Sequence, residues 1–191
     1  QNFMNPALAA RCFLLISFAG RMTDFAVKGG VIPVVTKVEA TTDALSGATP
    51  LAYLKEGSLF DLKALFLGNV PGTIGETSAL ALLAGGIFLV CMGIISLRIP
   101  LSYIGTFAVL TLITVSVRGY ADPLSFTLQE VCAGGIMLGA WFMATDYVTS
   151  PITPRGQIVF GVLLGILTWL FRIIGTATEG VSYAIIFMNL L

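Results

Sequence analysis

The sequence predicts an all-α fold, a polytopic transmembrane helical bundle with one long extramembrane loop. Apolar residues make up 57% of the 191 residues and charged residues only 10%, against roughly 25% charged in ordinary soluble domains. The apolar residues gather in runs that approach the ~20 residues a helix needs to cross a bilayer. Only helices and closed barrels satisfy backbone hydrogen bonds in lipid, and these runs have helical length. A typical cytosolic enzyme is therefore excluded.

Three regions are expected along the chain. Residues 1–20 hold the end of a membrane helix, with an apolar stretch over 7–20. Residues 21–77 carry 11 of the 20 charges and many turn-forming residues, so we expect an extramembrane loop with a short interfacial helix over 59–66. Residues 78–191 form a bundle of four to five spans. Because the chain starts without Met and stops inside a short apolar run, we expect a fragment of a longer protein.

The expected spans within the bundle are residues 79–97, 101–117, 131–145 and 157–174, with a last run starting at 181. Pro100 disfavours helix at the residue before it, which predicts a turn between the first two spans. Glycines inside the runs are expected to allow close helix packing; these are Gly134, Gly135, Gly139, Gly161 and Gly165. The pair Gly85-Gly86 either packs in the same way or breaks its helix beside a cofactor.

A threonine followed three residues later by a glutamate precedes three of the apolar runs. This spacing is typical of a capping box, in which a hydroxyl and a carboxylate satisfy the free N–H groups at a helix start. A sharper alternative is that three positive helix ends point towards a common anion on one side of the membrane. The pairs are Thr73-x-x-Glu76, Thr127-x-x-Glu130 and Thr176-x-x-Glu179.

Charge and metal-ligand content exclude several function classes. The net charge is +0, so the surplus of basic residues that a nucleic-acid partner requires is missing. The chain contains no His, the commonest general base and transition-metal ligand. Cys12, Cys91 and Cys132 are far apart in sequence and are expected to be buried apolar residues. We therefore predict no metal site and no catalytic residue in this chain. The Lys and Arg residues of the short loops balance, so they do not set the orientation.

The run from Asp43 to Leu51 carries the most specific chemical signal. It is a polar turn of small residues with an accessible hydroxyl. It resembles the flavinylation motif Asp-x-x-Ser-Gly-Ala-Thr, in which the last Thr is esterified to the phosphate of FMN. The matching residues are Asp43, Ser46, Gly47, Ala48 and Thr49.

The neighbours of this motif resemble one membrane family over nearly the whole chain. The matching segments are Asn5-Pro6-Ala7 with Arg11, the motif itself, residues 72–83, 142–146, 149–151, 179–180 and 188–189. The family is that of RnfD, from the Rnf electron-transport complex, and of its relative NqrB, from the sodium-pumping NADH:quinone oxidoreductase. Pro50-Leu51 after the motif favours the Rnf branch, whereas Asp146-Tyr147-Val148 departs from the usual Asp-Pro-Val.

The resemblance implies a membrane flavoprotein subunit of an ion-translocating ferredoxin:NAD oxidoreductase, inactive by itself. It implies covalent FMN on Thr49, on the extracytoplasmic face of the bacterial inner membrane, and non-covalent riboflavin as a possible second flavin. Implied partners are the other Rnf subunits, including a second covalent flavoprotein, and membrane lipid; ferredoxin and NAD are reached only through those subunits. Other residues expected near the FMN are Thr73, Glu76, Ser78 and Glu179.

Asp146 is expected on the cation route, because ionisable residues at membrane depth are costly and commonly functional. Asp146 and Arg172 both lie near span ends, where snorkelling or capping also explains them. Two other function classes stay open at this point. One is a secondary transporter or channel without a cofactor, with half-helices around 72–86 and 145–157. The other is a purely structural membrane protein. A covalently attached yellow chromophore separates the flavoprotein interpretation from both.

Overall fold

The computed structural model describes residues 5–18, 22, 50–55, 61–70, 72–73, 75–120, 122–174 and 180–190. Every regular element in these ranges is a helix, which confirms the predicted fold class. Two of the helices are long and apolar enough to cross a membrane, and a bent pair makes a third such span. The chain is therefore a multi-pass membrane protein.

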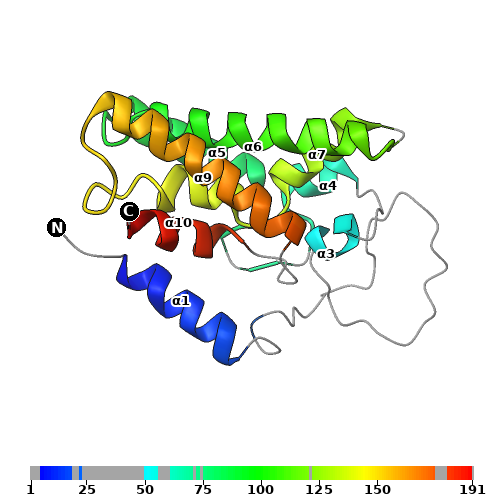
Figure 1. The fold of residues 1–191 in the computed structure, drawn as a ribbon, viewed down its shortest axis with the longest axis horizontal. Coiled ribbons are helices and arrows are strands. Elements are labelled where there is room, and N and C mark those ends of the chain that lie inside the picture. Colours follow the sequence, from blue (N-terminus) through cyan, green and yellow to red (C-terminus); the bar gives the residue numbers. More distant parts are fainter. Residues whose placement is uncertain are drawn as a thin grey trace.

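Helices α6 (Arg98–Val117) and α9 (Pro154–Ile174) form the centre of the bundle and run parallel, side by side, along its long axis (Figure 1). They approach closely because α9 presents glycines to α6. A β-carbon at Gly165 would lie 2.9 Å from the Tyr103 carbonyl oxygen and 3.1 Å from the Phe107 nitrogen. One at Gly161 would overlap Ser102. The predicted role of these two glycines in close packing is thus confirmed.

The span predicted at 131–145 is wrong in its boundaries, because it starts earlier and is broken. Helix α7 (Pro123–Cys132) begins with Pro123 in its first turn, after the N-cap Asp122. Helix α8 (Ile136–Leu138) continues as a π-helical turn, η1 (Gly139–Met143), and lies at 61° to α7. Between them Gly134 has a φ of +69°, a left-handed conformation that suits glycine and ends the first helix.

The span predicted at 79–97 is also shorter than expected. Helix α5 (Ala79–Cys91) ends at a turn in which Gly93 has a φ of +71° and its N–H donates to the Val90 carbonyl. Its 13 residues extend only about 20 Å. Helix α6 then starts at Arg98, and Pro100 lies in its first turn, where its missing N–H has no helical partner to lose.

The ends of the described chain pack together on one side of the central pair (Figure 1). Helix α1 (Pro6–Ser17) starts at Asn5, whose side chain accepts hydrogen bonds from the next turn, and it contacts α10 (Val181–Asn189). Both are shorter than the predicted runs 7–20 and 181–191. Helix α10 packs on α9 and η1, and α1 touches the bundle mainly through α10.

Two short helices lie within the region expected to be a loop. Helix α4 (Leu62–Leu67) starts at the N-cap Asp61 and contacts α5 and α7, so the helix predicted over 59–66 exists with later bounds. Helix α3 (Pro50–Lys55) packs against α7 through Leu51 and Leu54, both 1% exposed. The extramembrane position of 21–77 stays a prediction.

Candidate functional site

The break between α7 and α8 is closed by a side chain from another span. Arg172, near the end of α9, donates from Nη1 to the Glu130 carboxylate at 2.5 Å and to the Glu130 carbonyl at 2.7 Å. Its Nη2 donates to the Ala133 carbonyl at 3.0 Å, and its guanidinium lies 5.0 Å from the Phe107 ring centroid. Arg172 thus binds backbone oxygens at the C-terminal end of α7, where a positive charge is favoured. The capping role considered for Arg172 is correct, although the capped helix is not its own.

A second ion pair lies on another side of the same break. Arg11 of α1 donates to Glu76 Oε2 at 3.0 Å, and Glu76 is 5% exposed. A β-carbon at Gly135 would lie 3.6 Å from that same oxygen. The described structure therefore brings Glu76 to the α7–α8 junction, between the first helix and the broken span.

The capping boxes predicted at Thr73 and Thr127 are wrong. Thr127 and Glu130 lie inside α7, whose actual cap is Asp122, and the Thr127 hydroxyl donates to the carbonyl of Pro123. The carboxylates of Glu76 and Glu130 are bound by arginines from distant helices, which pairs each buried charge with an opposite one. The anion site at three helix starts accordingly loses α7 as a contributor.

The start of α5 is capped by Ser78 and not by the Thr73-x-x-Glu76 pair. The Ser78 hydroxyl accepts from the Ala81 N–H at 3.3 Å and donates to the Phe66 carbonyl at 3.4 Å, which joins α5 to α4. Thr73 is brought near Glu76 by a turn, in which the Glu76 N–H donates to its carbonyl at 3.1 Å. The buried Thr73 hydroxyl has no hydrogen-bond partner among the described atoms.

The flavin-attachment motif itself lies outside the described residues, and so do the third Thr-x-x-Glu pair and its Glu179. The motif residues concerned are Asp43, Ser46, Gly47, Ala48 and Thr49. The chain becomes described again at Pro50, the residue bonded to Thr49. Leu51 then contacts the break directly, because its Cδ2 lies 3.4 Å from the position of a β-carbon at Gly134.

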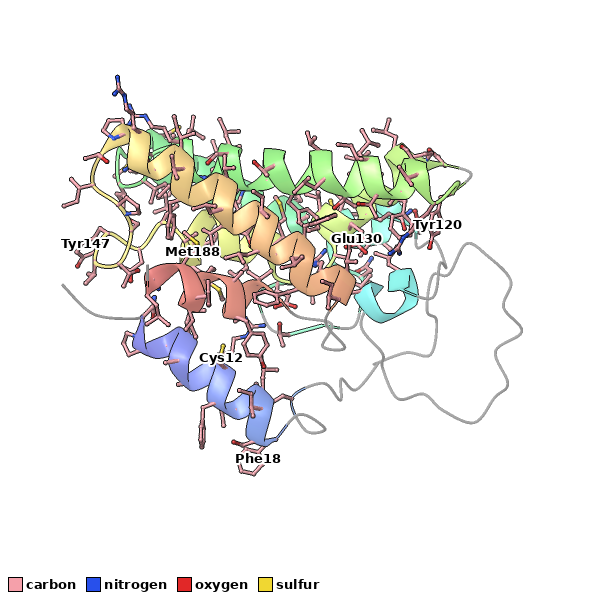
Figure 2. The ribbon with its side chains drawn as sticks, viewed as in Figure 1. Cys12, Phe18, Tyr120, Glu130, Tyr147 and Met188 are labelled. Atoms are coloured by element: carbon pink, nitrogen blue, oxygen red, sulfur yellow. The ribbon has the colours of Figure 1, made fainter. Side chains whose placement is uncertain are left out.

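A pocket of about 240 Å³ opens beside this junction, between α3, α6, α7 and α9. Its lining includes aromatic rings (Phe107, Tyr120, Phe126, Trp169) and the polar or charged residues Thr111, Thr114, Arg118, Glu130 and Arg172. Figure 2 shows Glu130 and Tyr120 at one end of the molecule, the end at which α3 lies. Two buried polar atoms of the lining, Thr111 Oγ1 and Arg172 Nε, have no partner among the described residues.

Asp146 lies at the opposite end of the long axis, where Figure 2 labels its neighbour Tyr147. Its carboxylate accepts from Asn5 Nδ2 at 3.2 Å, from the Val148 N–H at 3.3 Å and from the Thr149 hydroxyl at 3.4 Å. These bonds tie the start of α1 to the turn before α9. Asp146 is half-buried and does not meet the α7–α8 break. Among the described residues, no group of three or more Cys, Asp or Glu side chains gathers to hold a metal ion.

Sequence reasoning missed the pairing of Glu130 with Arg172 and of Arg11 with Glu76. A signal was present, because each pair combines opposite charges within or beside apolar runs, where an unpaired charge is costly. Which charge meets which depends on the arrangement of the helices, and the four residues are separated by 42 and 65 positions within their pairs.

Comparison with known proteins identifies the family. The model of the NQR2, RnfD, RnfE family matches residues 1–191. The chain is 46% identical over 194 residues to the RnfD-type subunit of the Na(+)-translocating ferredoxin:NAD(+) oxidoreductase complex of Acetobacterium woodii, covering 99% of the chain and 55% of that protein. It is 38% identical over 205 residues to the proton-translocating counterpart of Clostridium ljungdahlii, covering 99% and 57%.

Relatives of the quinone-reducing branch match as well. The NqrB-type subunit of the Na(+)-translocating NADH-quinone reductase of Klebsiella pneumoniae is 34% identical over 206 residues, covering 100% of this chain and 47% of that protein. The chain thus spans about half the length of the curated relatives it matches. With the family model matched from end to end, the chain belongs to the NQR2, RnfD, RnfE family.

Proposed function

We propose that this chain is part of the membrane subunit of an ion-translocating ferredoxin:NAD oxidoreductase complex and relays electrons through FMN bound covalently to Thr49. The relatives from Acetobacterium woodii and Clostridium ljungdahlii carry that activity in their names. The Ser46-Gly47-Ala48-Thr49 sequence, followed by Pro50, is the observation that carries the proposal, because it supplies a hydroxyl in a turn of small residues. FMN supplies one- and two-electron transfer, which the side chains of this chain lack.

The helix that follows Thr49 supports a fixed start for the tether. Leu51 and Leu54 of α3 are buried against α7, and burying a leucine side chain is worth about 2 kcal/mol. Helix α3 is thus held on the bundle, and its first residue is bonded to Thr49. A group on Thr49 starts one residue away from this anchored helix. Asp43, Ser46 and Glu179 are proposed to assist the tether, together with Thr73, Glu76 and Ser78.

We place Asp146 on the cation route. Helix α9 starts soon after Asp146 and ends beside α7, and its 21 residues extend about 30 Å, the thickness of the hydrocarbon layer. If Thr49 faces the extracytoplasmic side, Asp146 faces the cytoplasm, where cations are taken up or released. Its three hydrogen-bond donors hold the carboxylate in one position.

The partners follow from the same proposal. Ferredoxin and NAD bind other subunits of the complex, including one with a second covalent flavin, and riboflavin is a possible non-covalent cofactor. The protein lies in the bacterial inner membrane. Exposed apolar side chains on α1 and α6 are available to lipid or to neighbouring subunits; Phe13, Ile16, Leu101 and Val109 are more than half exposed.

The test of the attachment uses the complete complex with Thr49→Val, compared with Thr42→Val in the same segment. Thr49→Val should abolish flavin fluorescence of the denatured protein band, and Thr42→Val should retain it. The mass of the peptide containing Thr49 should exceed its unmodified mass by that of the FMN adduct. A bare Thr49 peptide from the native complex contradicts the proposal and favours a transporter or channel without a cofactor.

The test of the cation route uses Asp146→Asn in the complex reconstituted in vesicles. Asparagine keeps the size and one acceptor oxygen but removes the charge, so electron transfer is expected to lose its coupling to cation uptake. Unchanged cation transport per electron pair rules Asp146 out of the route. Asp122→Asn, at the exposed cap of α7, is the matched control and should leave coupling unchanged.

The NADH:quinone branch is the alternative within the family, supported by the 34% identity to the relative from Klebsiella pneumoniae. The two assignments differ in the electron acceptor and donor. Membranes that contain the complex should reduce NAD with reduced ferredoxin under the first and reduce quinone with NADH under the second.

A further inference from the structure

The pocket between α3, α6, α7 and α9 has the chemistry of a site for a planar aromatic ring. Phe107, Tyr120, Phe126 and Trp169 supply aromatic surface, which packs favourably on another flat ring. Ligand pockets are mostly apolar with a few polar groups that fix orientation, and threonine hydroxyls and arginines supply those groups here.

The hydrogen bonding of Thr111 is the first sign that the pocket has an occupant. Threonines inside helices usually donate to the carbonyl one turn back, and Thr114 and Thr127 do so at 2.8 Å. The buried Thr111 hydroxyl makes no such bond and has no partner among the described atoms. Leaving a buried hydroxyl unpaired is unfavourable, so a missing partner is expected beside Thr111.

Arg172 gives the second sign. Its Nη1 and Nη2 are engaged by Glu130 and Ala133, but its buried Nε has no described partner. An unused donor on a guanidinium matches an acceptor, such as a ring carbonyl or ring nitrogen. Two unsatisfied polar atoms on residues that line one pocket, from α6 and α9, thus favour a ring that carries hydrogen-bonding groups on its edge.

The position of the pocket identifies which ring is available. Leu54 of α3 lines it, and α3 starts at the residue bonded to Thr49. We infer that the pocket receives the isoalloxazine ring of the flavin tethered to Thr49, with the Thr111 hydroxyl and Arg172 Nε bound to polar atoms on the ring edge. This inference rests on the proposed function, because it takes the flavin on Thr49 as given.

Thr111→Val tests the inference with little risk to folding. Valine has the shape of threonine, and removing a hydroxyl that has no described partner leaves nothing unpaired behind. Thr106→Val is the matched control, because Thr106 lies on the same helix but packs against Gly165 of α9 and does not line the pocket. The readout is the midpoint potential of the complex's flavins, measured by redox titration of the visible absorption.

A donor at the ring edge stabilises the reduced ring, which carries more negative charge. Losing one such hydrogen bond should disfavour the reduced form about tenfold, which lowers the midpoint of the affected flavin by about 30 mV for a two-electron couple. Thr106→Val should leave all midpoints unchanged. The shift should disappear when Thr111→Val is combined with Thr49→Val, because the affected flavin is then absent.

Each other outcome has a distinct meaning. A shift that persists in the Thr49→Val background shows that a different, non-covalent group occupies the pocket and overturns the inference. No shift in the presence of a flavin-loaded Thr49 peptide also overturns it, while the proposed function stands. A Thr49 peptide without flavin overturns the proposed function first, and the inference with it.

Discussion

Arg172→Met is the change that tests most directly how the broken span is held. Arg172 is 8% exposed and makes hydrogen bonds to Glu130 and Ala133 over distances of 2.5 to 3.0 Å. Its removal leaves a buried carboxylate without a partner, which typically costs about 3–5 kcal/mol. We expect Arg172→Met to lower the free energy of unfolding by an amount in that range.

The size of the loss can be divided by a second variant. In Glu130→Leu/Arg172→Met no carboxylate remains unpaired, so only the two carbonyls freed at the end of α7 stay unsatisfied. The double variant should therefore lose less stability than Arg172→Met alone. Arg155→Met, an exposed arginine in the first turn of the same helix, should change stability by no more than about 0.5 kcal/mol.

The assay is unfolding of the full-length protein in mixed micelles by increasing SDS, followed by tryptophan fluorescence. Trp141 and Trp169 both lie within the bundle and report on its loss. Stability of Arg172→Met equal to that of the parent protein would refute the assignment of Arg172 as the group that closes the break. Equal losses in the single and the double variant would show that the unpaired carboxylate is not the source of the cost.

The same assay checks three further changes. Gly86→Ala should destabilise by about 1–3 kcal/mol, because its β-carbon would overlap the ring of Trp141; Gly85→Ala, which meets a ring atom at 3.1 Å, should cost less. Ser78→Ala should cost about 1 kcal/mol through the lost N-cap of α5, and Ser78→Asp should retain most of it. Gly134→Ala should cost about 1–2 kcal/mol, because its φ of +69° strains any residue with a β-carbon, and a result equal to the parent protein would mean that the break relaxes freely.

Hydropathy predicted the two central spans well because their apolar runs are long and uninterrupted. Residues 101–117 and 157–174 fall inside Arg98–Val117 and Pro154–Ile174, and both helices simply begin earlier. The glycine pattern of α9 also predicted its close packing, since small residues are what allows two backbones to approach. These features depend on the local sequence alone.

The broken span and the ion pairs could not be predicted in the same way. A glycine pair inside an apolar run is compatible with a continuous helix, and Gly85-Gly86 lies in one, whereas Gly134-Gly135 forms the break. The difference comes from Arg172, which satisfies the freed carbonyls from a helix about forty residues later in the chain. Glu130 matched a capping box in sequence because the pattern does not reveal where the helix begins.

The two proposed working ends of the chain are too far apart to influence each other by charge alone. Helix α9 connects the turn after Asp146 with the Arg172–Glu130 pair over about 30 Å. At an effective dielectric constant of about 20, one unit charge alters the energy of another at that distance by only about 0.5 kcal/mol, roughly a twofold effect. Tight coupling between electron and cation transfer therefore needs a cation that moves closer to the flavin, or an element with two positions. The 61° junction between α7 and α8, held by ion pairs to α1 on one side and to α9 on the other, is the described element that could change position without breaking a continuous helix.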